Sequence, residues 1–183
     1  MLIEHERDKL INVIIFFAKN TRNLGKVKLY KLLYFLDFQH YRDVGRPVTG
    51  LQYFAWPMGP VPVALEKEVR APAADMLEKV SLVLSSYKKG ETLTVTPKVE
   101  FNPGHFSKRE LKLMEALADE FRHTIAIDMI ERTHLENAPW DKIYNIQQRR
   151  QHAIPYALAV CAREAEELNM IQVEHEEIRT NFR

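Results

Sequence analysis

The chain has 183 residues, of which 46% are hydrophobic and 28% are charged. These proportions are ordinary for a globular domain and exclude a disordered chain, a collagen-like repeat or a coiled-coil rod. The 26 lysines and arginines nearly balance the 25 acidic residues, so a net charge of +1 creates no global attraction to nucleic acid or anionic membrane. We expect one folded domain over residues 1–183, with a polar tail from about residue 171.

The apolar run Leu10–Ala18 is the segment that most resembles a targeting signal. Acidic residues precede it, a lysine follows it, and it is too short to span a bilayer. Cys161 is the only cysteine, which excludes an internal disulfide and suits a reducing compartment. Its apolar neighbours predict a buried thiol. We therefore expect a soluble, cytoplasmic protein with no membrane partner.

The first 44 residues carry apolar side chains at helical spacing. The pattern predicts one helix over about 4–19 and a second over about 26–44, which ends at Gly45 with Pro47 beyond as a further stop signal. The second helix carries a leucine stripe, expected in the core, and a tyrosine stripe that includes an aspartate. The leucines are Leu29, Leu32, Leu33 and Leu36, and the second stripe holds Tyr30, Tyr34, Asp37 and Tyr41.

Prolines dominate the region that follows. Leu51–Trp56 alternates well enough to be a short strand. We expect Trp56–Pro62 to be a stiff loop, because each proline fixes its own φ and restricts the residue before it. Pro62 is well placed as the first residue of a helix through about Val69, with another helical turn or two between about 71 and 79.

Two β-favouring runs, about 80–87 and 91–99, predict a hairpin. Ser107 with Glu110 three residues on is a capping-box pattern and predicts the start of the next helix. The later helices are expected over about 126–135, after Pro139, and from near Ile154 to about Met170. The expected fold class is therefore mainly α with a small antiparallel β element (α+β), a single compact helical domain with a β-hairpin.

Motifs for catalysis are missing from the sequence. The His-Glu pairs at residues 5 and 175 lack the second histidine, four positions after the first, that a zinc-binding helix needs. There is no Gly-x-Ser-x-Gly elbow, and Gly25-Lys26 is followed by Val27 rather than the hydroxyl of a phosphate loop. We predict no catalytic residue, no metal ion and no cofactor.

Three interpretations of the residues stay open. Basic residues on the second helix and near residue 149 fit a DNA-binding regulator about as well as a solvated helix face. An enzyme site around His134, Asp128 and Glu131 is another alternative, although exposed helix charges also explain that trio. The tyrosine stripe with Trp56 fits a partner-binding surface or packing within the chain. The basic residues are Lys26, Lys28, Lys31, Arg42, Arg149 and Arg150.

Several segments resemble one family when they are read in order. Leu29–Phe35 resembles the Leu-x-Lys-Leu-Leu-Tyr-Phe helix of the Panacea domain, also described as SocA-like. The family's Gly-Arg-Pro turn, Gly-Pro-Val element, Thr-His pair and Pro-Trp pair are matched by Gly45-Arg46-Pro47, Gly59-Pro60-Val61, Thr133-His134 and Pro139-Trp140. Met58 departs from the family, which usually has Tyr before its Gly-Pro.

The resemblance implies a bacterial or phage antitoxin of a type II toxin–antitoxin pair, which neutralises a cognate toxin by direct binding or delivers it to a protease. Neither role requires catalysis. We predict partner contacts through the second helix and the loop after the short strand, provided that this patch is left uncovered by the chain's own fold. The predicted contacts are Tyr30, Lys31, Tyr34, Asp37, Trp56, Met58, Gly59, Pro60 and Val61. The residues given a structural role are Leu32, Leu33, Gly45, Pro47, His134, Pro139 and Trp140.

Overall fold

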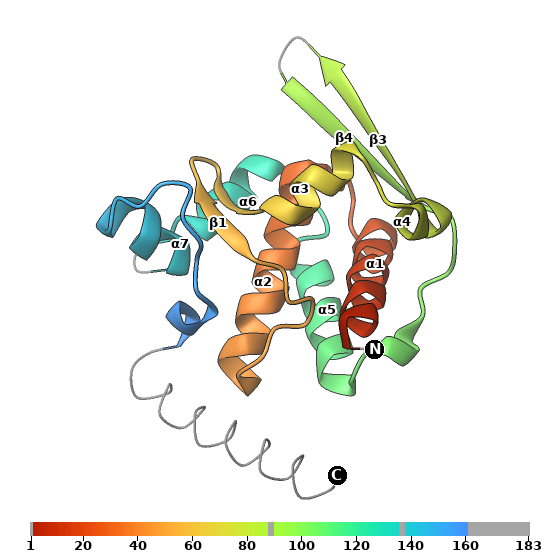
Figure 1. Cartoon of the computed structure of the whole chain (residues 1–183), viewed down its shortest axis with the longest axis horizontal. Coiled ribbons are helices and arrows are strands. Elements are labelled where there is room, and N and C mark those ends of the chain that lie inside the picture. The colour runs from red at the N-terminus through yellow and green to blue at the C-terminus, as the bar shows by residue number, and fades with distance from the viewer. Residues whose placement is uncertain (1, 88–89, 136–137, 161–183) are drawn as a thin grey trace, which may run out of the picture.

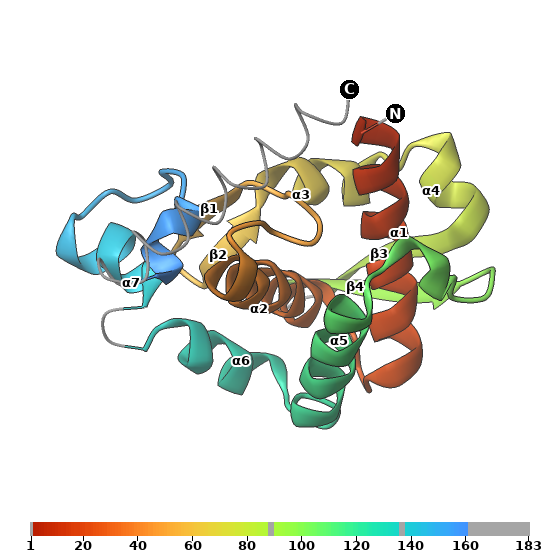
Figure 2. The same ribbon diagram turned by 90° about the horizontal axis from the view of Figure 1, so that it is seen from below.

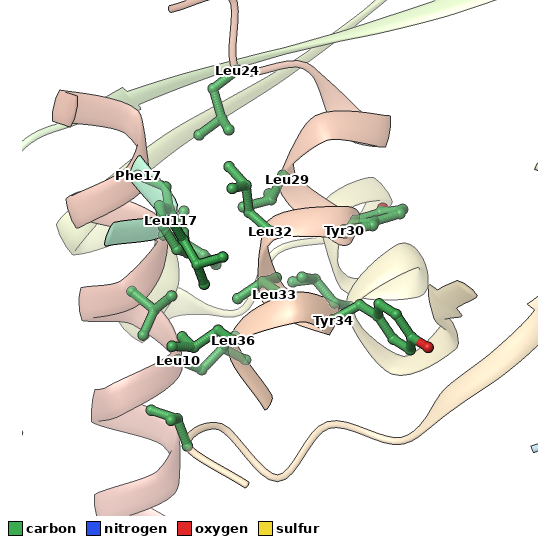
Figure 3. Close-up of a cluster of buried hydrophobic side chains, with 14 of the residues drawn as sticks. Leu10, Phe17, Leu24, Leu29, Tyr30, Leu32, Leu33, Tyr34, Leu36 and Leu117 are labelled. Carbon is green, nitrogen blue, oxygen red and sulfur yellow. The ribbon is translucent and has the colours of Figure 1, made fainter. Parts of the chain in front are cut away.

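Helix α2 (Lys26–Val44) lies at the centre of the molecule, with α1 (Leu2–Asn20) and α5 (Lys108–Glu120) on one side of it (Figures 1 and 2). The computed structural model describes residues 2–87, 90–135 and 138–160. The leucine stripe of α2 is fully buried and points toward Phe17 of α1 and Leu117 of α5 (Figure 3). Each buried leucine contributes about 1.5–3 kcal/mol, so this seam stabilises the packing of the three helices. Its four leucines are Leu29, Leu32, Leu33 and Leu36.

The bounds of α2 confirm the sequence prediction, because its end is encoded locally. Gly45 adopts a left-handed φ of 71° and its N–H donates to the carbonyl of Tyr41 at 2.7 Å. Glycine adopts this conformation without steric cost, which is why it commonly terminates a helix. The turn therefore directs the chain back along α2 toward Val48 and Thr49.

The two short strands β1 (Tyr53–Trp56) and β2 (Gly59–Pro62) form an antiparallel hairpin against α2. The expectation that Trp56–Pro62 is a loop was wrong, since its second half is a strand. Pro60 lies opposite Ala55 in the hairpin. The N–H of Ala55 donates to the carbonyl of His152 and its carbonyl accepts from the N–H of Gln151, so both backbone groups of Ala55 point away from Pro60. A proline is tolerated at such a position because the strand pair needs no N–H there.

Two short helices, α3 (Val63–Arg70) and α4 (Ala74–Lys79), lead into the second hairpin. Strands β3 (Val80–Tyr87) and β4 (Gly90–Pro97) pair antiparallel, which confirms the predicted hairpin. One face of this hairpin packs on the core, and its far end projects from the body at the top of Figure 1. The core-facing side chains are Leu82, Leu84, Leu93 and Val95.

Most elements after the second hairpin are helical within the described residues. Helix α5 begins with the predicted capping box, in which Ser107 accepts from the N–H of Glu110 and Glu110 accepts from the N–H of Ser107. The remaining elements are η1 (Pro103–His105), α6 (Ala126–Thr133), α7 (Pro139–Asp141), η2 (Lys142–Ile146) and η3 (Tyr156–Ala159). The fold class is therefore mainly helical with small antiparallel hairpins, as the sequence predicts.

The predicted last helix does not begin at Ile154. The N–H of Ile154 donates to the carbonyl of Tyr53 at 2.8 Å, so this segment lies along β1, and η3 is the helical element that follows it up to residue 160, where the described range ends. Cys161, the remainder of the predicted helix and the polar tail lie outside the described residues. Within the described ranges, no helix has both the length and the apolar character needed to cross a bilayer.

Candidate partner-binding site

Lys31 is buried where α2 passes the β1–β2 hairpin. Only 2% of its surface is exposed, and its Nζ donates to the carbonyl of Pro60 at 2.9 Å. Burial disfavours the charged ammonium and lowers the pKa of Lys31 to about 7. The amine therefore holds the second strand of the hairpin from inside the molecule.

Gly59 lies at the start of β2 in a position where any side chain would be strained. Its φ is 93°, in the left-handed region. A Cβ added there would lie 2.6 Å from Oγ1 of Thr133 and 2.7 Å from Nζ of Lys31. Three segments far apart in the sequence thus meet at one point, because the glycine lets them approach.

Trp140 fixes the other side of the same turn. Its Nε1 donates to the carbonyl of Trp56 at 2.9 Å, and 2% of its surface is exposed. Its ring is stacked against His134, with centroids 3.8 Å apart, and against Tyr144, with centroids 4.6 Å apart. Pro139 supplies the first residue of the helical turn that carries the tryptophan.

His134 is half-buried beside Lys31. Burial and the charge of Lys31 lower the pKa of His134, while the carboxylate of Asp141 opposes this shift. The Nε2 atom is buried and has no hydrogen-bond partner among the described residues. We call Lys31, Gly59, Thr133, His134 and Trp140 the turn cluster, because together they surround the β1–β2 turn.

The turn cluster leaves one large apolar side chain at the surface. Met58, directly before Gly59, is 56% exposed. Trp56 and Val61 are half-buried on the face of the hairpin opposite to the buried Tyr53 and Ala55. The chain therefore presents a methionine on a turn that is held from three directions.

A second exposed apolar side chain follows Thr133 in the chain. Leu135 is 57% exposed and comes two residues after Thr133, whose Oγ1 lies at Gly59. The Thr133-His134 pair matches a family motif, but neither Thr133 nor Leu135 is among the predicted site residues. The Thr-His pair could have indicated Thr133, whereas an exposed leucine has no sequence signal of its own. We call Trp56, Met58, Val61 and Leu135 the turn surface.

In the tyrosine stripe of α2, Tyr30 and Tyr34 are buried and Tyr41 is half-buried, so the condition that this patch is left uncovered is not met there. Tyr30 is 3% exposed and donates to Glu66 at 2.6 Å. Tyr34 is 3% exposed and packs against the rings of Phe38 and Tyr53. Figure 3 shows both tyrosines on the side of α2 away from the leucine seam. The β1–β2 hairpin, α3 and η3 occupy that side, which a helical period alone does not reveal.

Asp37 is likewise internal, with no exposed surface. Its carboxylate accepts from the N–H of Val48 at 2.9 Å, the N–H of Thr49 at 2.7 Å, the hydroxyl of Thr49 at 2.5 Å and the hydroxyl of Tyr53 at 2.8 Å. It therefore ties the loop after Gly45 to α2. With Lys31, Gly59 and Pro60 also buried, the surface-accessible members of the predicted contact set are Trp56, Met58 and Val61.

The basic residues of α2 do not form the surface that a DNA-binding helix would need. Lys28 is 1% exposed and its Nζ donates to the carbonyls of Arg22 and Arg122. Lys26 pairs with Glu66 and Glu91, and Lys31 is buried in the turn cluster. Arg42, Arg149 and Arg150 are exposed.

The residues of the alternative enzyme site lie in different surroundings. Asp128 and Glu131 are exposed on α6, whereas the ring of His134 is stacked on Trp140. The charged groups that act on His134 are Lys31 and Asp141. Among the described residues, no group of histidine, cysteine and acidic side chains could hold a metal ion.

The buried amine gives the turn cluster a testable pH dependence. The folded state binds the Lys31 proton less tightly than the unfolded chain, so stability from this group rises as pH increases above about 7. The Lys31→Met variant lacks this titration. We expect wild-type stability to rise by about 2–3 kcal/mol relative to Lys31→Met between pH 7 and 9. Urea unfolding at both pH values measures it, and parallel profiles would contradict the burial of a titrating amine.

One of the comparisons with known proteins gives a match. The chain is a mainly helical α+β domain, and its β1–β2 turn exposes an apolar side chain at the surface. A family model described as "Antitoxin SocA-like, Panacea domain" matches residues 29–141, which is more than half of the chain and includes the whole turn cluster. The chain therefore belongs to the SocA-like antitoxin family. Searches of curated proteins and of solved structures returned no match.

Proposed function

We propose that the chain is an antitoxin that neutralises a cognate protein toxin by direct contact through the turn surface. The observation that carries this proposal is the exposure of Met58 on a turn held by the turn cluster. A pre-ordered apolar turn binds a partner with little loss of conformational entropy. Methionine also adapts to irregular partner surfaces, and neighbouring Leu135 extends the apolar area.

Neutralisation by contact needs no catalytic group, so this function is compatible with the buried and paired state of Lys31 and Asp37. The same docking serves two outcomes for the toxin, sequestration or delivery to a protease. The half-life of the toxin in cells separates them. Sequestration leaves the half-life unchanged when the chain is present, whereas delivery shortens it.

The primary experiment uses the product of the adjacent gene. That product is expressed alone and together with this chain, and cell growth and copurification are recorded. We expect the neighbouring product to arrest growth alone, and we expect co-expression to restore growth and yield a complex. A product that is harmless alone, or one that forms no complex with this chain, would remove the basis of the antitoxin proposal.

The variant Met58→Glu tests which surface binds the toxin. A charge at an exposed position leaves the fold intact but cannot enter an apolar contact, so we expect at least a tenfold loss of affinity, or about 1.4 kcal/mol. Leu77→Glu is the matched control, because Leu77 is also exposed, at 41%, but lies on α4. Isothermal titration with the toxin measures both. Equal affinities of the two variants would assign the contact to another surface.

A further inference from the structure

The β1–β2 hairpin has both of its edges closed. Residues 151–154 form hydrogen bonds with the outer side of β1. The N–H of Ala55 donates to the carbonyl of His152, and the N–H of Gln151 donates to the carbonyl of Ala55. The outer side of β2 carries Pro60 and Pro62, which have no N–H to offer. Pairing with another strand is therefore blocked at this hairpin, as is usual for natural edge strands.

The β3–β4 hairpin differs, and the phase of its ladder shows which groups point outward. The N–H of Lys98 donates to the carbonyl of Lys79 at 2.9 Å, so these two residues form a hydrogen-bonded pair. Alternation then makes Val80 opposite Pro97 a non-bonded pair, which agrees with the missing N–H of the proline. The backbone groups that point away from β4 belong to Val80, Leu82, Leu84 and Ser86.

The outward groups of Leu82, Leu84 and Ser86 have no backbone partner among the residues that the structure describes, whereas the N–H of Val80 donates to the carbonyl of Met76 at the end of α4. Strand β3 reads Val-Ser-Leu-Val-Leu-Ser-Ser-Tyr, with no charge, proline or glycine, so it carries none of the usual devices that protect an edge. Strand β4, by contrast, carries Gly90, Glu91 and Pro97. The β3 edge is thus open and favourable for strand pairing.

We propose that β3 pairs antiparallel with β3 of a second copy of this chain, centred on Val83. A strand without charges does not repel its own copy, which favours a second copy over a charged partner segment. In this register Leu82 bonds Leu84 of the second copy, and the two Val83 side chains face each other on the exposed side of the sheet. Val83 is 51% exposed in the single chain.

Pairing at this edge forms a continuous four-stranded sheet from two projecting hairpins. A sheet of three or more strands with an apolar face is considerably more stable than a two-stranded hairpin. The hairpin projects from the body in Figure 1, so its far half is accessible to a second molecule. This inference concerns the assembly of the chain and does not depend on the toxin.

Sedimentation velocity of the full chain over a range of concentrations tests the assembly. We expect the mass of two 21.5 kDa chains at high concentration. Ser86→Pro removes an outward N–H without removing a bond to β4, so this variant should keep its circular dichroism spectrum and sediment as one chain. A wild-type monomer at all concentrations, or a dimer that persists in Ser86→Pro, would overturn the proposal.

A pair of cysteine variants tests the register. Val83→Cys would place two thiols at a non-bonded pair about 4.5–5.5 Å apart between Cβ atoms, within reach of a disulfide. Thr94→Cys is the matched control, because Thr94 faces Val83 on β4 and its two copies would be separated by three strand spacings, about 14 Å. We expect oxidised dimers from Val83→Cys above the level of the unmodified chain. Equal cross-linking of both variants would overturn the proposed pairing.

Discussion

Replacement of Asp37 by alanine should lower the free energy of unfolding by about 3–5 kcal/mol, a large part of the stability of a domain of this size. The carboxylate is fully buried and accepts from Val48, Thr49 and Tyr53. Alanine would leave these donors unpaired in the interior, and each such group costs about 1–3 kcal/mol. Urea unfolding followed by circular dichroism measures the loss, and a loss below about 1 kcal/mol would contradict the role of Asp37 as an anchor.

The pH dependence of the same residue provides an independent measurement. Burial raises the pKa of Asp37 from 3.8 to about 6, although its hydrogen bonds oppose the shift. The folded state therefore binds this proton more tightly than the unfolded chain. The stabilisation is fully present below about pH 3.8 and is lost as pH rises through about 6. The wild type should gain stability over Asp37→Asn between pH 7 and 4, whereas a constant difference would contradict the shift.

Replacement of Gly59 by alanine is the second change with a large expected effect. The added Cβ would be strained by the left-handed φ and would crowd Oγ1 of Thr133 and Nζ of Lys31. We expect the two effects together to lower the free energy of unfolding by about 3 kcal/mol. Because the displaced groups belong to the turn cluster, toxin binding should fall by at least tenfold at temperatures where the variant remains folded. Thermal unfolding and titration with the toxin measure the two effects.

Substitutions at two other glycines distinguish the effect of backbone strain from the effect of a crowded Cβ. Gly90 has a φ of 131° but open space around its Cβ position, so Gly90→Ala should cost only the backbone strain, about 1 kcal/mol. Gly25 has an ordinary φ of −88° and nothing within 4 Å, so Gly25→Ala should change stability by less than about 1 kcal/mol. If Gly59→Ala costs no more than Gly90→Ala, the close approach at the turn cluster is not maintained in solution.

Local signals in the sequence predict the helices well. The apolar spacing of α2 and its stop at Gly45 depend on a few neighbouring residues, so both bounds are found. The β3–β4 hairpin and the capping box at Ser107 are similarly local. Strand β2 was missed because two of its four residues are prolines, whose tolerance depends on which side of the strand is bonded.

Burial at the candidate site could not be read from the sequence. Lysine is almost never fully buried, so Lys28 and Lys31 were expected at the surface. Their partners are backbone carbonyls at Arg122 and Pro60, far from them along the chain. The tyrosine stripe shows the same limit, because a helical period places side chains on one face without indicating what covers that face. The resemblance to the family identified the residues of the turn cluster, but not that they meet.

Site-specific photo-crosslinking shows whether the turn surface contacts the toxin. A photoreactive amino acid is placed at Met58 in one variant and at Leu77 in another, since both positions are exposed. We expect position 58 to capture the toxin in the co-expressed complex and position 77 not to capture it. Capture from position 77 without capture from position 58 would contradict it.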